Sequence, residues 1–229
     1  YFGLREAPFA LTPDPAFLFL TESHQRALEG LAGFVSRGEG YAVLYGDIGT
    51  GKTTLCRALL ERLHPNVETA LIVNPFLDEA DLLRAIASDL GIPLQDTPAE
   101  RSNTQKLLET VGGFLAETRR GGKRCAVIMD EAHNLPIPAL EQLRVIGNLE
   151  TNKEKLLQVI LVGQEELMDL LSSPRVTQLH QRIARWFHLD PLTAEDIELY
   201  FRFRMERAGM EKELKITREA SALVHRLTS

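Results

Sequence analysis

The stretch Gly46-Asp47-Ile48-Gly49-Thr50-Gly51-Lys52-Thr53 matches the phosphate-binding pattern G-x-x-x-x-G-K-[ST] at every specified position. An apolar run at residues 41–45 precedes it and predicts a buried strand, while residues 54–63 carry apolar side chains at helical spacing. A strand, a glycine-rich turn and a helix form the setting in which this pattern binds a polyphosphate. A turn that binds nothing is the alternative, but Lys-Thr at this offset favours a nucleoside triphosphate site.

Each part of this pattern has a physical role in holding a nucleotide. Glycines let the backbone approach closely, so that its N–H groups point at the phosphates. The start of the helix adds a partial positive charge, and Lys52 adds a full charge toward the β- and γ-phosphates. The hydroxyl of Thr53 is suited to ligate Mg²⁺. The expected ligands are ATP and Mg²⁺, with the nucleotide held by Gly46, Asp47, Ile48, Gly49, Thr50, Gly51, Lys52, Thr53 and Thr54.

A second landmark is the acidic pair Asp130-Glu131, which follows an apolar run at residues 125–129. Ligands collect at the carboxyl ends of parallel strands, where these two side chains would lie. Asp130 is expected to hold Mg²⁺ through water, and Glu131 to orient and polarise the attacking water. The pair continues as Asp-Glu-Ala-His133, similar to a helicase signature, but the remaining length cannot hold a second motor domain.

Length and composition place the chain among ordinary globular proteins. It has 229 residues, 44% hydrophobic and 25% charged, and its formal charge of −6 argues against a strongly basic nucleic-acid surface. No apolar run reaches the roughly eighteen residues of a membrane span. Because the chain begins at Tyr1 rather than Met, we expect a fragment, and an anchor of the full-length protein in the bacterial inner membrane is one candidate arrangement. Cys56 and Cys125 are expected to be reduced core residues, which fits a cytoplasmic location.

Strands and helices alternate along residues 1–191, which predicts an α/β domain with a parallel sheet flanked by helices. Residues 1–20, rich in proline and phenylalanine, are expected to be extended, either as a belt on the core or as part of a purine pocket. A helix is predicted over residues 175–185 and a short strand over 186–189. Residues 192–229 are expected to form an incomplete helical lid, which opens with a capping box at Thr193–Asp196.

Several stretches together resemble a known family, the AAA+ ATPases of the ExeA, or general secretion pathway A, group of P-loop NTPases. They are residues 2–9, 11–15, 46–53, 130–135, 148–151, 161–164 and 181–183, and their order matches over nearly the whole chain. Relatives in that group serve type II secretion, pilus assembly and exopolysaccharide export. More distant relatives assist DNA transposition.

The resemblance implies further site residues. Gln164 resembles a sensor of the γ-phosphate, and Asn74 resembles the polar partner that holds the catalytic glutamate until assembly. Arg182 resembles an arginine finger that reaches the γ-phosphate of a neighbouring subunit. Capping of strand ends is the alternative for Gln164 and Asn74. For Arg182 the alternative is a solvated helix face, and Arg175 and Arg185 compete for its role.

Two functions remain in competition. In the first, the protein is an ATPase that self-assembles as a ring, with a hexamer as one candidate, and drives or regulates an envelope machine through an inner-membrane or envelope partner. In the second, it is a DNA-associated regulator of the transposition-helper type, for which Arg202, Arg204 and Arg207 are the nearest basic patch. A slow, nucleotide-gated scaffold is a third option, against which Glu131 argues. The sensor 2 element of the family lies beyond Ser229.

Overall fold

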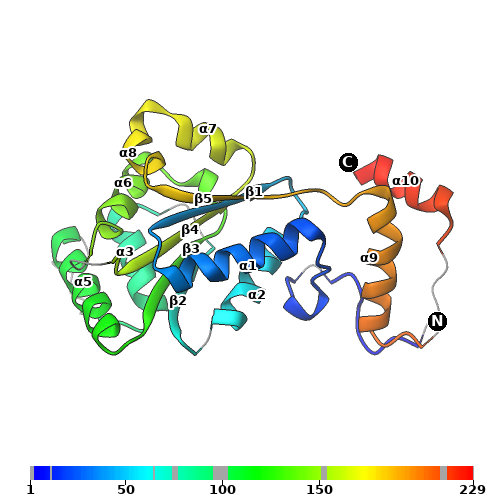
Figure 1. Cartoon of the computed structure of the whole chain (residues 1–229), viewed down its shortest axis with the longest axis horizontal. Coiled ribbons are helices and arrows are strands. Elements are labelled where there is room, and N and C mark those ends of the chain that lie inside the picture. Colours follow the sequence, from blue (N-terminus) through cyan, green and yellow to red (C-terminus); the bar gives the residue numbers. More distant parts are fainter. Residues whose placement is uncertain are drawn as a thin grey trace.

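Five parallel strands form the centre of the molecule in this computed structural model, in the order β2-β3-β4-β1-β5 (Figure 1). The structure describes residues 3–10, 12–63, 65–73, 77–94, 103–150, 154–211 and 216–228. The strands are β1 (Tyr41–Gly46), β2 (Val67–Ile72), β3 (Arg124–Met129), β4 (Leu157–Gly163) and β5 (Ile183–Leu189). β4 is buried along its whole length, as a strand covered on both faces should be.

Helices cover both faces of the sheet, which confirms the predicted α/β class (Figure 1). On one face, α1 (Glu22–Arg37) and α2 (Lys52–Leu63) bury side chains such as Leu44, Ile128 and Ile160. On the other, α3 (Glu79–Asp89), α5 (Thr104–Arg120), α6 (Ile137–Ile146) and α7 (Glu166–Ser172) bury Val43, Val127 and Val159. Successive strand residues therefore serve opposite cores, because side chains alternate across a strand. Cys56 and Cys125 are free and buried in these cores, as predicted.

The strand order brings the predicted site segments to one edge of the sheet. β4 pairs with β1 on one side and with β3 on the other. All three are parallel, so their carboxyl ends lie together at the same edge. The phosphate loop follows β1, the acidic pair follows β3, and Gln164 follows β4 between them. Gln164 thus lies at the end of the strand beside the one that leads to Asp130.

The predicted helix over residues 175–185 is wrong. A 3₁₀ turn (Pro174–Val176) and the short helix α8 (Thr177–His180) are followed by a turn at Arg182, and β5 already begins at Ile183. β5 pairs with the open edge of β1, with Ile183 opposite Tyr41 and Trp186 opposite Val43. Backbone pairing with the sheet thus overrides the helical spacing of this stretch.

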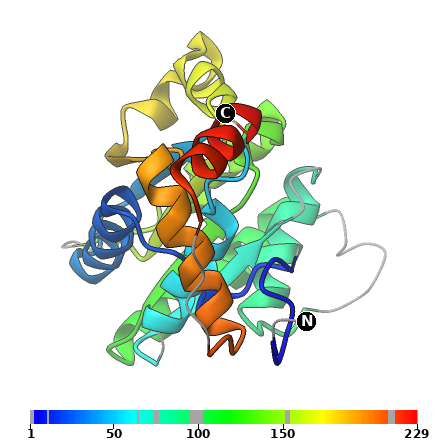
Figure 2. The same cartoon turned by 90° about the vertical axis from the view of Figure 1, so that its right-hand side faces the viewer.

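Two further helices, α9 (Ala194–Arg207) and α10 (Arg218–Thr228), lie beyond the end of the sheet and are reached by an extended linker after β5 (Figures 1 and 2). The capping box at Thr193 and Asp196 is present as predicted. Within the described residues, none of the helices combines the length and the apolar character needed to cross a membrane.

The N-terminal segment connects α9 to the rest of the molecule. Its 3₁₀ turn, Pro15–Phe17, is capped by Asp14, and the guanidinium of Arg57 in α2 donates to the carbonyl of Pro13 at 3.0 Å. From α9, Arg204 donates to the carbonyl of Phe17 at 2.9 Å, and its guanidinium lies 4.9 Å from the centre of the Phe17 ring. The predicted extended segment therefore packs between α2 and α9.

Candidate active site

The loop between β1 and α2 has the backbone that only glycine adopts freely. Gly49 and Gly51 have φ values of 81° and 86°, in the left-handed region. A Cβ on Gly46 would lie 2.5 Å from the carbonyl oxygen of Leu189 in β5. These glycines let the loop backbone pass close to the start of α2. The first N–H groups of a helix and its dipole attract anions there.

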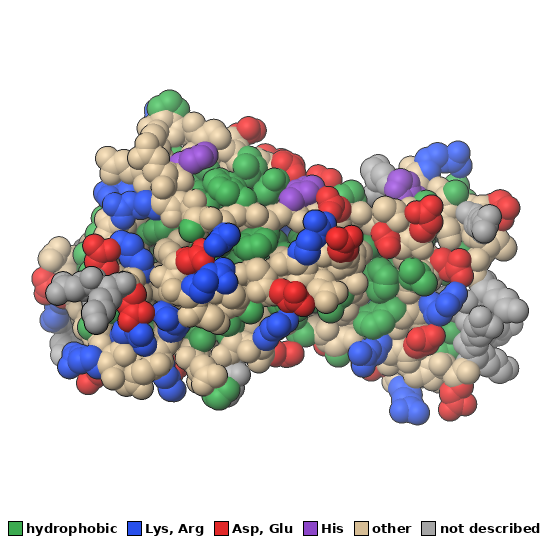
Figure 3. Space-filling view, in the orientation of Figure 1, with side chains coloured by type: hydrophobic (Ala, Val, Ile, Leu, Met, Phe, Trp, Pro, Cys, Tyr) green, Lys and Arg blue, Asp and Glu red, His purple; other side chains and the backbone are tan. Residues whose placement is uncertain are grey.

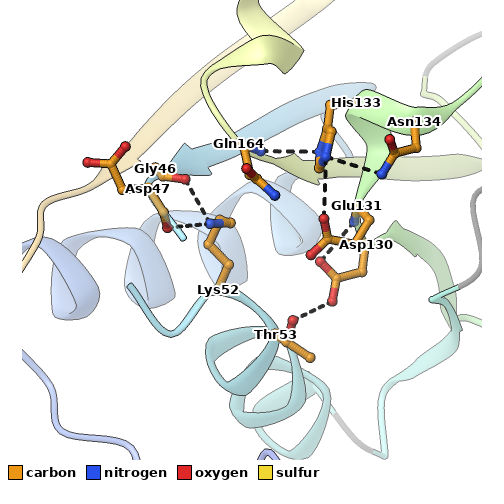
Figure 4. A network of polar contacts seen from close by, with 9 residues as sticks. All are labelled: Gly46, Asp47, Lys52, Thr53, Asp130, Glu131, His133, Asn134 and Gln164. Atoms are coloured by element: carbon orange, nitrogen blue, oxygen red, sulfur yellow. Dashed lines mark hydrogen bonds and ion pairs between the residues drawn. The ribbon is translucent and has the colours of Figure 1, made fainter. Parts of the chain in front are cut away.

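Lys52 reaches back over this loop from the first turn of α2. Its ammonium donates to the carbonyls of Gly46 at 2.7 Å and of Asp47 at 2.6 Å, and the side chain is buried (Figure 4). Burial lowers the pKa of Lys52 from its ordinary value, while the carboxylates of Glu131 and Asp130 act in the opposite direction. The two hydrogen bonds to backbone carbonyls hold the ammonium at the cavity, and the nearby carboxylates favour its charged form.

Thr53 and Asp130 join the phosphate loop to the end of β3. The Thr53 hydroxyl donates to Oδ2 of Asp130 at 2.6 Å, and Oδ1 of Asp130 accepts the N–H of Glu131 at 3.0 Å. Asp130 is 2% exposed. A hydroxyl and a carboxylate fit Mg²⁺, which prefers oxygen ligands in an octahedron completed by phosphates and water. In the described part of the chain, no group of three or more His, Cys, Asp and Glu offers a cage made of protein alone.

Glu131 has a strained backbone. Its φ of 53° lies in the left-handed region, unlike any other non-glycine residue that the structure describes. Such a conformation costs roughly 1–3 kcal/mol and is found where the surrounding structure enforces it, often at functional sites. The residue helps to line a cavity of about 260 Å³ together with Ile48, Gly49, Gly51, Lys52, Thr53, Thr54 and Gln164.

His133 connects Glu131 to the end of β4, and sequence reasoning missed this role. Its Nε2 lies 3.5 Å from a carboxylate oxygen of Glu131, and its Nδ1 accepts the backbone N–H of Gln164 at 3.4 Å (Figure 4). Nε2 also lies 3.1 Å from Nδ2 of Asn134. The imidazole therefore lies between the carboxylate of Glu131, the side chain of Asn134 and the backbone of Gln164. The signal in the sequence that could have found it is the His of Asp-Glu-Ala-His133.

The structure separates the candidate finger residues from this cavity. Arg182 is exposed in the turn before β5, next to Ile183, which pairs with Tyr41 at the start of β1. Gly46 ends the same strand, roughly 16 Å away at the strand rise. Arg185 lies on β5 and bonds to Glu39 at 2.9 and 3.3 Å. Arg175 is exposed in the 3₁₀ turn before α8, and Asn74 lies outside the described residues.

A second cavity, of about 510 Å³, adjoins the phosphate loop. It is lined by residues of the N-terminal segment, the loop and α9, including Pro13, Phe17, Leu18, Gly51 and Tyr200. An apolar wall with a few polar groups is typical of sites for small organic ligands. The N-terminal segment is therefore both a packed belt and a cavity wall, so the two sequence alternatives are compatible. His24 of α1 also lines this cavity, a placement that nothing in the sequence indicated.

The family match agrees with this arrangement. The model of a family described as "AAA domain" matches residues 35–171, which contain the phosphate loop, the acidic pair and Gln164. This chain belongs to the AAA domain family. It is also 41% identical, over 228 residues, to "General secretion pathway protein A" of Aeromonas hydrophila. The resemblance predicted from the motifs is confirmed, although this AAA chain spans only 41% of the length of that relative.

Solved structures share the fold at low sequence identity. The Walker-type ATPase of Pyrococcus abyssi has a TM-score of 0.65 and 18% identity, over 96% of this chain and 67% of that one. Cdc6p of Pyrobaculum aerophilum gives 0.63 and 18%, over 95% and 59%. The ORC2 protein of Aeropyrum pernix, in its ADPNP–ADP complexes, gives 0.63 and 18%, over 86% and 56%. These likenesses support the AAA+ fold.

Proposed function

We propose that this protein is an AAA+ ATPase that binds ATP with Mg²⁺ and hydrolyses it to ADP and phosphate. The observation that carries the proposal is the convergence of Lys52, Thr53, Glu131 and Gln164 on one cavity of about 260 Å³. A buried cation, oxygen ligands suited to a metal and a carboxylate near solvent are the groups that phosphoryl transfer to water requires.

The two adjoining cavities suit the two halves of the nucleotide. The phosphates would lie over Gly49, Gly51 and Lys52, where N–H groups and the ammonium neutralise their charge. The nucleoside would occupy the larger cavity beside Phe17 and Tyr200. Thr53 and Asp130 would hold Mg²⁺, which would supply positive charge to neutralise the phosphates.

Glu131 is the residue that would orient and polarise the attacking water. Its side chain is 40% exposed, so water can reach it, and the imidazole of His133, 3.5 Å away, limits where its carboxylate points. Gln164 would sense the γ-phosphate from the end of β4. Because the backbone of Gln164 donates to His133, a shift of Gln164 would be felt at Glu131. Asn74 remains a proposed partner of Glu131 on the strength of the resemblance.

The position of Arg182 supports the proposal that the active site is shared between subunits. The residue lies at the end of the sheet opposite its own phosphate loop, exposed in a turn rather than in a helix. A finger at that end would serve a neighbouring subunit, where it would neutralise charge on the transferred phosphoryl group. Arg185 is less suited because Glu39 already holds it. We propose a ring oligomer on this basis, with a hexamer as the candidate number.

The biological role is proposed from the name of the relative. Similarity to a general secretion pathway protein supports a role in driving or regulating the assembly of a secretion, pilus or polysaccharide-export machine. A DNA-associated role has less support, because the three lid arginines are not a free basic surface. Arg202 pairs with Glu198, Arg204 is folded onto the N-terminal segment, and Arg207 lies over Phe203. In Figure 3, acidic and basic side chains are interspersed on the visible surface of the part of the molecule that contains α9 and α10.

The deciding experiment measures MgATP hydrolysis per subunit at rising protein concentration, with and without duplex DNA, on a chain extended past Ser229. We expect specific activity to rise with concentration and to ignore DNA, because the finger comes from a neighbour. Activity that stays flat until DNA is added would favour the transposition-type function. An extended chain that hydrolyses no ATP under any of these conditions would overturn the ATPase proposal.

A further inference from the structure

His24 lies in the first turn of α1 and contacts the phosphate loop, although 26 residues separate it from Thr50. The side chain is 3% exposed. Its Nε2 lies 2.8 Å from the carbonyl oxygen of Thr50, and its Nδ1 lies 2.6 Å from the hydroxyl oxygen of Thr21. Both ring nitrogens therefore have partners, one of them in the loop that the proposed function assigns to phosphate.

These two partners fix the state of the ring. A carbonyl oxygen can only accept, so Nε2 must carry the hydrogen that is donated to Thr50. Nδ1 is then free to accept the hydroxyl hydrogen of Thr21. Burial lowers the pKa of His24 from its ordinary value of 6.5, and this effect exceeds the opposing effects of the Thr50 hydrogen bond and of Asp190 and Asp196. A neutral ring with one donor and one acceptor matches both contacts.

The contact with Thr50 sets the direction of the next N–H. The Thr50–Gly51 peptide is planar, and in a trans peptide the N–H points opposite to the carbonyl. Because the carbonyl of Thr50 points at His24, the N–H of Gly51 points away from it. Gly51 lines the 260 Å³ phosphate cavity. His24 is not among the residues that line that cavity and lines the 510 Å³ cavity instead, so the imidazole contacts the Thr50–Gly51 peptide from outside the phosphate cavity.

The remaining contacts of the loop do not replace this one. The N–H and hydroxyl of Thr50 both bond back to the carbonyl of Asp47, at 3.4 and 2.9 Å, and this turn leaves the Thr50 carbonyl to its outside partner. The imidazole also packs closely on the loop, since a Cβ on Gly51 would lie 3.3 Å from Nε2. His24 thus restrains the one peptide of the loop that joins Thr50 to the left-handed Gly51.

We propose that His24 is a positioning residue for nucleotide binding, which holds the Thr50–Gly51 peptide so that the N–H of Gly51 is presented to the phosphates. This inference rests on the proposed ATP site and deepens it. It requires a donor at the position of Nε2, not an imidazole as such. A side chain with a donor at that distance should substitute for it, and one that fills the same volume without a donor should not.

The test measures the affinity of MgADP and of adenosine by competition against a fluorescent ADP analogue. His24→Leu fills the volume without a donor, His24→Gln can place an amide N–H near the position of Nε2, and His24→Asn is too short to do so. Gln25→Ala is the matched control, because Gln25 is exposed in the same turn and bonds only locally to Glu29. Circular dichroism and thermal unfolding confirm that each variant is folded.

We expect MgADP affinity to fall about tenfold in His24→Leu and His24→Asn, the effect of losing about one well-placed hydrogen bond. His24→Gln should recover most of it. Because His24 also lines the cavity proposed for the nucleoside, adenosine affinity is measured as the reference, and it should fall less than MgADP affinity in His24→Leu and His24→Asn. If His24→Leu does not fold, the contrast between His24→Gln and His24→Asn still decides the matter. Equal affinities in those two variants, or an equal loss for adenosine, would overturn the inference. A wild-type protein that binds no MgADP would overturn the proposed function instead.

Discussion

Thr53 and Asp130, 77 residues apart in the sequence, meet through a 2.6 Å hydrogen bond between hydroxyl and carboxylate. Thr53 lies in the first turn of α2, which follows β1, and Asp130 follows β3; β4 lies between these two strands in the sheet. The contact therefore exists only when β1, β4 and β3 are all paired in register. The two halves of the proposed metal site are assembled by the same packing that forms the core.

Replacement of Lys52 by alanine should reduce MgATP affinity until binding is barely detectable. The ammonium is a buried charge beside the phosphate cavity, and charge-assisted hydrogen bonds contribute about 1.5–3 kcal/mol each. We expect MgATP affinity to fall by about a hundredfold or more, measured by titration calorimetry. Lys123→Ala is the control, because Lys123 pairs with Glu68 on the surface just before β3 begins. Unchanged affinity in Lys52→Ala would remove the phosphate-loop assignment.

Glu131→Gln should separate binding from hydrolysis. The amide keeps the size of the side chain but cannot polarise water as a carboxylate does, so turnover should fall by about a hundred- to ten-thousand-fold. MgATP affinity should stay close to that of the wild type, and the ATP-bound state should accumulate. Single-turnover quench measurements would follow both quantities, with the surface variant Glu141→Gln as control. Wild-type turnover in Glu131→Gln would place water activation elsewhere.

The sequence predicted the main parts of the site because each is a local signal. The phosphate loop is a contiguous pattern, and the pair Asp130-Glu131 directly follows a buried strand. His24 and His133 were missed because their partners, Thr50 and Gln164, are distant in the sequence and are backbone groups, which carry no signature of their own. The helix expected around Arg182 failed because pairing along β1, a non-local term, decides the structure there.

His133→Leu should lower turnover more than affinity. The imidazole lies between the carboxylate of Glu131 and the backbone of Gln164, outside the residues that line the phosphate cavity. Loss of the imidazole leaves the carboxylate free to sample other positions, so kcat should fall about tenfold while KM stays near the wild-type value. Steady-state kinetics of the extended chain would measure both constants. An equal rise of KM would indicate that His133 supports binding of the nucleotide instead.

Arg182→Ala and Glu131→Gln should complement each other if the finger acts between subunits. Each variant alone should be inactive, since an arginine finger contributes about a thousand- to a hundred-thousand-fold to turnover. In a mixed oligomer, some interfaces pair the intact Glu131 of one subunit with the intact Arg182 of its neighbour, so part of the activity should return. Coupled-assay measurements on mixtures at fixed total protein would detect it.

The matched mixture with Arg185→Ala tests the competing residue, which Glu39 holds in the present structure. Recovery with the Arg182 variant favours Arg182 as the trans finger. Its absence, in mixtures shown by native mass spectrometry to contain both subunits, would refute the shared site.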